Sequence, residues 1–276
     1  MSKKANLEKS RNLDQFYTDP NYAQYFYNKI LEHVNVDDFD IVLEPSAGTG
    51  NFYNLFPAAK RVGVDLEPKA QGVIKQNFFD YQPKINSKVI TIGNPPFGKN
   101  STLAIQFFNH AAKFSDVIAF VLPRTFKKDS VINRLDKNFH LVYEEIVPDN
   151  SFIFNDNPYN VWCCAQIWVK KSEARETIKR YTFKDVSKWF EIVEPEHADF
   201  SVQRVGGKAG VIRTVDFKSY SPLSHYYIKQ HDPKVLNVFQ TINFQNVKFN
   251  TAGNPSISPS ELIKLWLDAA AKMGLI

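Results

Sequence analysis

The stretch VLEPSAGTGNF, residues 42–52, joins a short apolar run to a loop that holds Gly48 and Gly50. Glycines placed directly after a strand let the backbone approach a ligand closely, and a helix that starts behind them offers free N–H donors. We expect such a helix to begin after Gly50. No Gly-Lys-Ser/Thr follows, so the stretch is not a P-loop, nor is it a complete G-x-G-x-x-G. Taken alone, it is equally compatible with a binding loop and with a plain tight turn.

Around this loop, short apolar runs alternate with segments of helical spacing. The strand-like runs are DIVLEP (40–45), RVGVDLEP (61–68), KVITIGNPP (88–96) and DVIAFVLP (116–123). The helix-like segments are NYAQYFYNKILEHV (21–34) and TLAIQFFNHAAKF (102–114), the second with Asn100 or Ser101 as its cap. This alternation predicts a parallel sheet with helices on both faces, whose strands bind ligands at their carboxyl ends.

The pattern changes in the second half of the chain. HLVYEEIVP (140–148) and NVWCCAQIWVKK (160–171) predict an antiparallel hairpin that closes one edge of the sheet. Beyond it we expect strands in FSVQRVGG, KAGVIRTV and NVKFNTAG, and a final helix in PSELIKLWLDAAAKM. We therefore divide the chain into an α/β domain over residues 1–170 and a smaller α+β domain over residues 171–276.

Composition limits the classes of protein to consider. The 276 residues carry a net charge of +5, and residues 171–276 alone carry +4, a mild bias that fits a polyanionic partner. No apolar run is long enough to span a membrane, and the charged start has no signal-peptide core. The two cysteines, Cys163 and Cys164, lie in an apolar run, which predicts buried thiols in a cytoplasmic protein. The six histidines have no metal-ligand spacing, so we expect no metal site.

Two further strand ends carry side chains suited to chemistry. Asp65 lies at the end of the strand-like run in GVDLEP, where an acidic residue suits the hydroxyls of a ribose. Glu67 is a second candidate for that role. A purely structural alternative is that Asp65 caps a helix. With the glycine loop, this indicates an adenosine-containing ligand such as NAD or S-adenosylmethionine. The third end is TIGNPPFGKN (91–100), where two prolines stiffen the loop between Asn94 and Phe97. A surface turn would explain the prolines, but not their place beside the other two strand ends.

Together, these motifs resemble those of the amino-methyltransferases that use S-adenosylmethionine, in particular the N6-adenine enzymes. EPSAGTGNF is similar to their cofactor motif, GVDLEP to their ribose motif and NPPF to their catalytic motif. QFYTDP (15–20) resembles the segment that folds over the methionine part of the cofactor, and KQNFFDY (75–81) the loop at its adenine. The motif order resembles the gamma arrangement of DNA methyltransferases. The resemblance covers roughly residues 11–170 and continues weakly into TAGNPSISPSEL (251–262), which resembles recognition regions of restriction-modification enzymes.

The resemblance implies a Rossmann-like methyltransferase fold, S-adenosyl-L-methionine as cofactor and two groups of site residues. Asn77 departs from the pattern, because an acidic residue is usual there; its amide could still pair with adenine, or Asp80 could replace it. In the catalytic motif, the Asn94 oxygen and the Pro95 carbonyl would accept the two N–H groups of the target amine, and Phe97 would stack on a flipped base. The implied cofactor-binding residues are Thr18, Glu44, Ser46, Gly48, Gly50, Asp65, Asn77 and Phe78, and the catalytic ones are Asn94, Pro95, Pro96 and Phe97.

We therefore expect a DNA adenine-N6 methyltransferase whose residues 171–276 recognise the target. The alternatives are adenine-N6 methylation of RNA, including cap-adjacent adenosine, methylation of a protein glutamine or of cytosine N4, and a non-catalytic nucleic-acid-binding subunit of the same fold. Phe152 and Phe154 are candidates for a second aromatic wall, although such residues more often fill a core. Arg204, Lys208 and Arg213 are candidates for phosphate or base contacts, although a solvated hairpin edge would explain them equally well.

Overall fold

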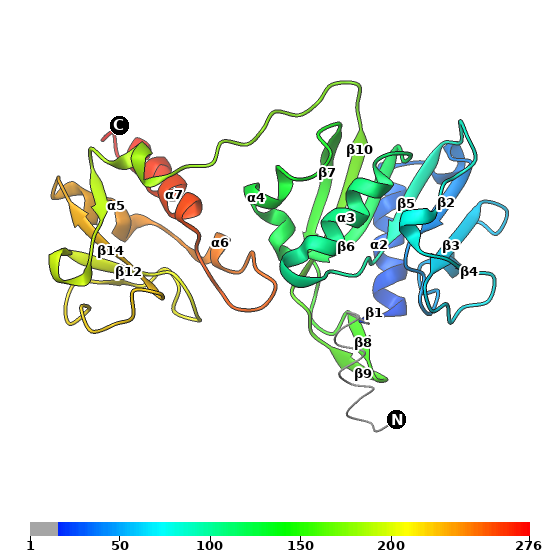
Figure 1. Cartoon of the computed structure of the whole chain (residues 1–276), viewed down its shortest axis with the longest axis horizontal. Helices are drawn as coiled ribbons and strands as arrows, with labels where there is room; N and C mark the ends of the chain where they lie inside the picture. Colours follow the sequence, from blue (N-terminus) through cyan, green and yellow to red (C-terminus); the bar gives the residue numbers. More distant parts are fainter. Residues whose placement is uncertain (1–15) are drawn as a thin grey trace. The chain divides into compact units, whose positions relative to one another are not determined.

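A computed structural model describes residues 16–276 of the chain, drawn in Figure 1. The chain forms two compact units that divide between Ile178 and Lys179. Within the described residues, no helix has the length and apolar character needed to cross a bilayer. Each unit has its own sheet and its own hydrophobic core, so each is described by itself.

The first unit is built on a seven-stranded sheet in the order β4-β3-β2-β5-β6-β10-β7. Adjacent strands run parallel from β4 through to β6, and β10 is antiparallel to both of its neighbours, β6 and β7. The strand order reverses at β2, because β3 and β4 lie on one side of it and β5 and β6 on the other. In such sheets, ligands bind in the crevice at the carboxyl ends of the strands beside this point. This is the expected Rossmann-like methyltransferase arrangement, with the expected antiparallel hairpin at one edge. The strands are β2 (Ile41–Glu44), β3 (Arg61–Asp65), β4 (Ile74–Lys75), β5 (Val89–Gly93), β6 (Val117–Pro123), β7 (Phe139–Ile146) and β10 (Cys163–Lys170).

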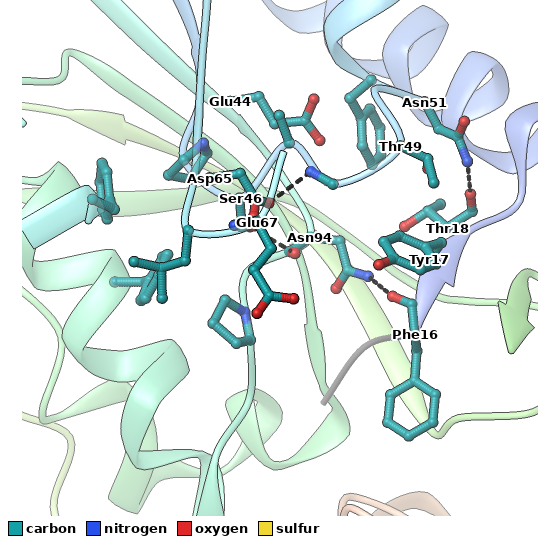
Figure 2. A pocket seen from close by; sticks show the side chains of 18 of the residues that line it. Phe16, Tyr17, Thr18, Glu44, Ser46, Thr49, Asn51, Asp65, Glu67 and Asn94 are labelled. Atoms are coloured by element: carbon teal, nitrogen blue, oxygen red, sulfur yellow. Dashed lines mark hydrogen bonds between the residues drawn. The ribbon is translucent and has the colours of Figure 1, made fainter. Parts of the chain in front are cut away.

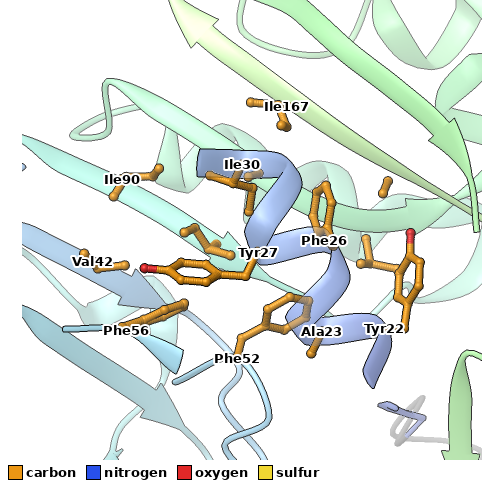
Figure 3. Close-up of a cluster of buried hydrophobic side chains, with 14 of the residues drawn as sticks. Tyr22, Ala23, Phe26, Tyr27, Ile30, Val42, Phe52, Phe56, Ile90 and Ile167 are labelled. Carbon is orange, nitrogen blue, oxygen red and sulfur yellow. The ribbon is translucent and has the colours of Figure 1, made fainter. Parts of the chain in front are cut away.

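Helices cover both faces of this sheet, as the alternation predicts. Helix α2 (Pro20–His33) begins at Asp19, whose side chain accepts the N–H of Asn21 at 2.9 Å, and it packs against one face. Figure 3 shows its apolar side chains against Val42 and Ile90 of the sheet. Helix α3 (Thr102–Ala111) packs against the other face, and the short helix α4 (Asp129–Ile132) lies on that side too. Because side chains alternate along a strand, Cys163 belongs to the first core and Cys164 to the second, both as buried thiols.

The segment between the hairpin strands forms a small sheet that was not expected. Strands β8 (Phe152–Phe154) and β9 (Asn157–Tyr159) pair with each other, and β8 also pairs with β1 (Tyr17–Thr18). Thr18 lies opposite Phe152 in this register. Strands β8 and β9 therefore hold Tyr17 and Thr18, which precede α2, in place beside the large sheet.

Two local expectations in this unit are wrong. After Gly50 the chain forms only a 3-10 turn, Tyr53–Leu55, and no α-helix. Pro57 explains this, because the residue before a proline avoids helical geometry, and Phe56 is extended with ψ 150°. Ser101 does stand at the start of α3, but its side chain makes no capping bond; its hydroxyl pairs with that of Thr125 at 2.6 Å instead.

The second unit is an antiparallel sheet with helices on one face, the α+β class that the sequence predicts. The strand order is β11-β14-β12-β13, and α5 (Lys234–Thr241) and α7 (Pro259–Lys272) pack around Trp266 and Phe239. The final helix lies where it was predicted. The prediction of a strand in NVKFNTAG is wrong, because helix α6 (Gln245–Lys248) occupies part of this segment. Phe244 and Val247 are three residues apart, so one helical turn packs both against the same core. The strands are β11 (Phe190–Ile192), β12 (Phe200–Gln203), β13 (Ile212–Arg213) and β14 (His225–Gln230).

Candidate active site

A pocket of about 260 Å³ opens where β2, β3 and β5 end, at the place expected for a ligand. Figure 2 shows its side chains converging from these three strand ends and from β1. Gly50, Pro95 and Phe97 do not line the pocket, although all three belong to the predicted set. The predicted residues that do line it are Thr18, Glu44, Ser46, Gly48, Asp65, Asn77, Phe78, Asn94 and Pro96.

The glycine loop passes unusually close to an aromatic ring. Gly48 has φ +46°, and a Cβ added there would lie 2.7 Å from a carbon of the Tyr17 ring. The Gly48 N–H donates to Oδ2 of Asp65 at 2.7 Å, which ties the loop to the end of the next strand. A side chain at position 48 would therefore fill the space between loop and ring, so the pocket needs glycine there.

Both candidate ribose acids reach the pocket, with different surroundings. The second oxygen of Asp65, Oδ1, accepts the N–H of Glu67 at 2.7 Å, so two backbone donors fix this carboxylate in place. Each carboxylate oxygen has a further lone pair for a hydroxyl donor. Glu67 is an exposed residue on the pocket lining and is labelled in Figure 2. The geometry is compatible with a shared role of Asp65 and Glu67 toward two adjacent hydroxyls.

Glu44 lies beneath the loop and is almost completely buried. Its Oε2 accepts the N–H of Tyr53 at 2.6 Å. Burial raises the pKa of the Glu44 carboxyl well above its usual range; the Tyr53 bond opposes this rise, and the charge of Asp65 adds to it. Burial therefore favours the neutral form of Glu44, whose Oε2 supports the loop through Tyr53.

The NPPF segment presents one buried hydrogen-bond acceptor to which no described residue donates. Nδ2 of Asn94 donates to the carbonyl of Phe16 at 3.0 Å, and the Ser46 hydroxyl donates to the Asn94 carbonyl at 3.0 Å. The first bond fixes the orientation of the side-chain amide, and the second holds the backbone of the same residue. Its Oδ1 is buried and has no hydrogen-bond partner among the described residues. A buried acceptor in this position is suited to an N–H donor of a ligand, because leaving it unpaired is costly.

The segment Phe16–Thr18 contributes more than its sequence motif indicated. Besides the Phe16 carbonyl and the Tyr17 ring, Thr18 brings a buried hydroxyl that has no partner among the described residues. The side chain of Asn51 donates to the Thr18 carbonyl at 2.6 Å and so ties this segment to the glycine loop. Spacing alone gave no signal for Asn51, since its role depends on a strand that approaches from a distant part of the chain.

The residues after β4 could hold the adenine of an adenosine-containing ligand. Phe78 is buried, while Phe79 and Leu66 remain partly or largely exposed on the pocket lining. Oδ1 of Asn77 accepts the N–H of Phe79 at 3.1 Å, which leaves its amide group at the pocket. Asp80, the alternative contact, does not line the pocket. Apolar walls, two carboxylates and a glycine cradle together fit the parts of S-adenosylmethionine.

The aromatic candidates separate into core and surface residues. Phe152 is fully buried in the core beside α2, so it does not form a wall of the pocket. Phe154 is only partly buried and packs near Phe16, which itself stacks on Tyr159 at 5.0 Å between ring centroids. Phe97 packs against both cores of the first unit. Of the two hairpin phenylalanines, only Phe154 is available to a bound base.

The basic candidates of the second unit have different surroundings. The Arg204 guanidinium lies 5.2 Å from the ring of Tyr226, a core residue, whereas Lys208 is exposed. Arg213 donates from Nη2 to the side chain of Gln203 at 2.9 Å. These three residues do not share one set of contacts.

Comparisons with known proteins relate only to the fold. No family model and no curated protein matches the chain. Among solved structures, the chain is similar to a proposed RNA methyltransferase from Pyrococcus horikoshii, with 18% identity, a TM-score of 0.46, and 57% of this chain and 87% of the other covered. It is also similar to the 23S rRNA methyltransferase ErmE, with 14% identity, a TM-score of 0.41, and coverage of 58% and 71%. A third similar structure is the magnesium protoporphyrin IX methyltransferase of Synechocystis with bound SAH, with 13% identity, a TM-score of 0.37, and coverage of 54% and 83%.

Proposed function

We propose that this chain is an S-adenosylmethionine-dependent methyltransferase that methylates the N6 amine of adenine in DNA. The observation that carries the proposal is Oδ1 of Asn94, which is buried and has no hydrogen-bond partner among the described residues. The bond from Nδ2 of the same amide to the Phe16 carbonyl orients it at a pocket that suits the cofactor. The residues 171–276 are proposed to recognise the target sequence, and the cytoplasm is the proposed location.

The cofactor-binding roles follow from the pocket. When bound, S-adenosylmethionine supplies a methyl group activated by its sulfonium. Asp65 and Glu67 would accept the ribose hydroxyls, and Phe79 with Asn77 would hold the adenine. The loop at Gly48 and the hydroxyl of Thr18 would hold the methionine part, with Glu44, Ser46, Gly50 and Phe78 supporting these contacts from behind.

The catalytic roles rest on the chemistry of a conjugated amine. The lone pair of the N6 nitrogen is delocalised into the ring, which makes the amine a poor nucleophile. Two acceptors, Oδ1 of Asn94 and the carbonyl of Pro95, would bind its two N–H groups and favour a pyramidal nitrogen whose lone pair faces the methyl group. The nitrogen would gain the methyl group as the carbon–sulfur bond of the sulfonium breaks, with that electron pair left on the sulfur, and it would then lose one proton to solvent. Pro96 adds rigidity to this loop, and Phe97 would stack on the flipped base.

The test offers tritiated S-adenosylmethionine and the full chain to unmethylated genomic DNA and to total RNA in parallel, followed by identification of the labelled nucleosides. We expect label in N6-methyldeoxyadenosine. Label only in RNA would transfer the same chemistry to an RNA adenine. Label in neither, with the cofactor still bound, would overturn the nucleic-acid substrate and favour a protein glutamine amide, which is also planar and conjugated. Label in N4-methylcytosine would retain the mechanism and change the base.

A further inference from the structure

A second polar site lies in the second unit, on the face of its sheet opposite to the helices. Alternation along β12 places Phe200 and Val202 in the helix-covered core and Ser201 and Gln203 on the other face. The neighbouring strands add to this face, because Ser201 pairs with Arg213 on one side and Gln203 pairs with His225 on the other. An arginine, a histidine, a serine and a glutamine are thus neighbours on one surface of the sheet.

Three polar atoms of this cluster are buried and have no hydrogen-bond partner among the described residues. They are the Ser201 hydroxyl, Nη1 of Arg213 and Nε2 of His225. Ser201 is fully buried and His225 is only 5% exposed. Three unpaired polar atoms from adjacent strands are unusual in a folded protein, where nearly all buried polar groups are paired. Their coincidence on one face indicates a site that accepts a polar ligand.

The donors and acceptors of the cluster are defined by the surrounding bonds. Nη2 of Arg213 is bound to Gln203, so Nη1 remains as a free donor. The Ser224 hydroxyl donates to the Ser221 carbonyl at 3.0 Å and lies 3.0 Å from Nδ1 of His225. With that bond made, the hydroxyl oxygen accepts the proton of Nδ1, and Nε2 is then the acceptor of the neutral ring. Burial lowers the pKa of His225 and the charge of Arg213 lowers it further, while a hydrogen bond with the backbone of Ser221 opposes this shift.

An aromatic side chain packs against two members of the cluster. The ring of Tyr220 stacks on His225 at 4.9 Å between centroids and lies 4.8 Å from the guanidinium carbon of Arg213. Tyr220 is itself 44% exposed, and its carbonyl is held by the Tyr227 hydroxyl at 2.6 Å. Tyr220 is thus a partly exposed side chain that contacts both residues, and rotation of its ring is the route by which a ligand would reach Nη1 and Nε2.

We propose that this cluster, named here the Tyr220 site, binds the edge of an adenine base in nucleic acid. A donor beside an acceptor matches the N7 acceptor and the N6 amine of adenine; guanine presents two acceptors at the same edge, and a phosphate presents acceptors only. Tyr220 supplies an aromatic surface on which a base can stack. The inference takes nucleic acid as the partner from the proposed function, but it involves a site separate from the NPPF motif.

The test compares binding of fluorescein-labelled short oligo(dA), its 7-deazaadenine counterpart and oligo(dT) of equal length, by fluorescence anisotropy with the full chain. The three probes carry equal charge, so differences report base contacts. We expect oligo(dA) to bind about tenfold more tightly than the other two, in line with a good two-bond base contact. Equal affinity for all three probes would overturn the proposal.

Variants assign the preference to a site. Arg213→Gln and His225→Phe should abolish the preference for oligo(dA); the second variant keeps a ring against Tyr220, and thermal unfolding reports whether each variant folds. Lys208→Gln, which removes an exposed positive charge outside the cluster, should retain it. A preference that is lost in Asn94→Ala but kept in Arg213→Gln would assign the adenine to the first unit and overturn the Tyr220 site, with the proposed methyl transfer intact. If methyl transfer were absent while the preference for oligo(dA) depended on Arg213, the Tyr220 site would be supported and the proposed methyl transfer would be overturned.

Discussion

Replacement of Asn94 by alanine tests the central feature of the proposed mechanism. The variant lacks the buried Oδ1 acceptor, whose counterpart in other preorganised sites contributes roughly 10²–10³-fold to kcat, or about 3–4 kcal/mol. It also lacks the bond from Nδ2 to the Phe16 carbonyl, which costs about 1 kcal/mol of stability. We therefore expect methyl transfer to fall by at least that factor while the affinity for S-adenosylmethionine changes little.

The assay combines single-turnover transfer from tritiated S-adenosylmethionine with calorimetric titration of the cofactor. Asn51→Ala is the matched control, because it removes the 2.6 Å bond to the Thr18 carbonyl and so loosens the same strand while Oδ1 of Asn94 remains. The control should lose cofactor affinity more than rate. Asn94→Asp adds a third case, with acceptor oxygens but no donor for the Phe16 carbonyl.

Two results would contradict the acceptor role of Asn94. If Asn94→Ala lost cofactor affinity and rate to the same extent, the side chain would be part of the cofactor site and not an acceptor for the target amine. If Asn51→Ala lost as much rate as Asn94→Ala, the position of the strand would explain the effect, and the unpartnered oxygen would have no special role.

Three further predictions follow from the pocket and the core. Gly48→Ala should lower both the midpoint of thermal unfolding and the cofactor affinity, because left-handed backbone geometry costs about 1–2 kcal/mol and the new Cβ meets the Tyr17 ring. Gly274→Ala is the control: Gly274 has φ +67° and open space around it, so this variant should show the backbone cost alone. Because the pKa of Glu44 is raised, the folded state retains a proton that the unfolded state loses. The free energy of unfolding is therefore highest below the ordinary carboxyl pKa. It falls by about 1.4 kcal/mol per pH unit as the pH rises toward the pKa of the folded state. Glu44→Gln should remove that slope from denaturant titrations at a series of pH values, and an unchanged slope would assign it to another group. Ellman's reagent should label neither Cys163 nor Cys164 in the folded chain and both after unfolding, because burial raises the pKa of each thiol; rapid labelling of the folded chain would contradict the packing described.

Much of the first unit could be predicted because its signals are local. Apolar runs of strand length, their alternation with helical spacing and the glycine loop depend on neighbours in the chain, and the sheet and hairpin formed as expected. The helix predicted after Gly50 does not form, and the reason is equally local: Pro57 ends the turn. The spacing of apolar residues, on which the prediction relied, does not register a proline. In the second unit, NVKFNTAG has strand-like composition, but Phe244 and Val247 pack on one core through a helical turn.

The candidate site was less predictable, since its properties arise from bonds between distant residues. The sequence identified Asn94 but not the orientation of its amide, which depends on a carbonyl 78 residues away. It identified Asp65 and Glu67 as competitors but not the two backbone donors that fix the first of them. Arg213 was a candidate on charge alone, and nothing in its surrounding sequence indicated His225 or Tyr220 as neighbours.

The pairing of β1 with β8 also bears on how the chain folds during synthesis. Strand β1 leaves the ribosome well before β8, and it has no partner until Phe152 and Ile153 have emerged. Closing so long a loop is entropically unfavourable, and contacts of large sequence separation form late. The nascent chain can therefore pack α2 and the first parallel strands before the amide of Asn94 acquires its fixed orientation. Ribosome-bound chains that end before β8 should already be compact and yet unable to transfer a methyl group.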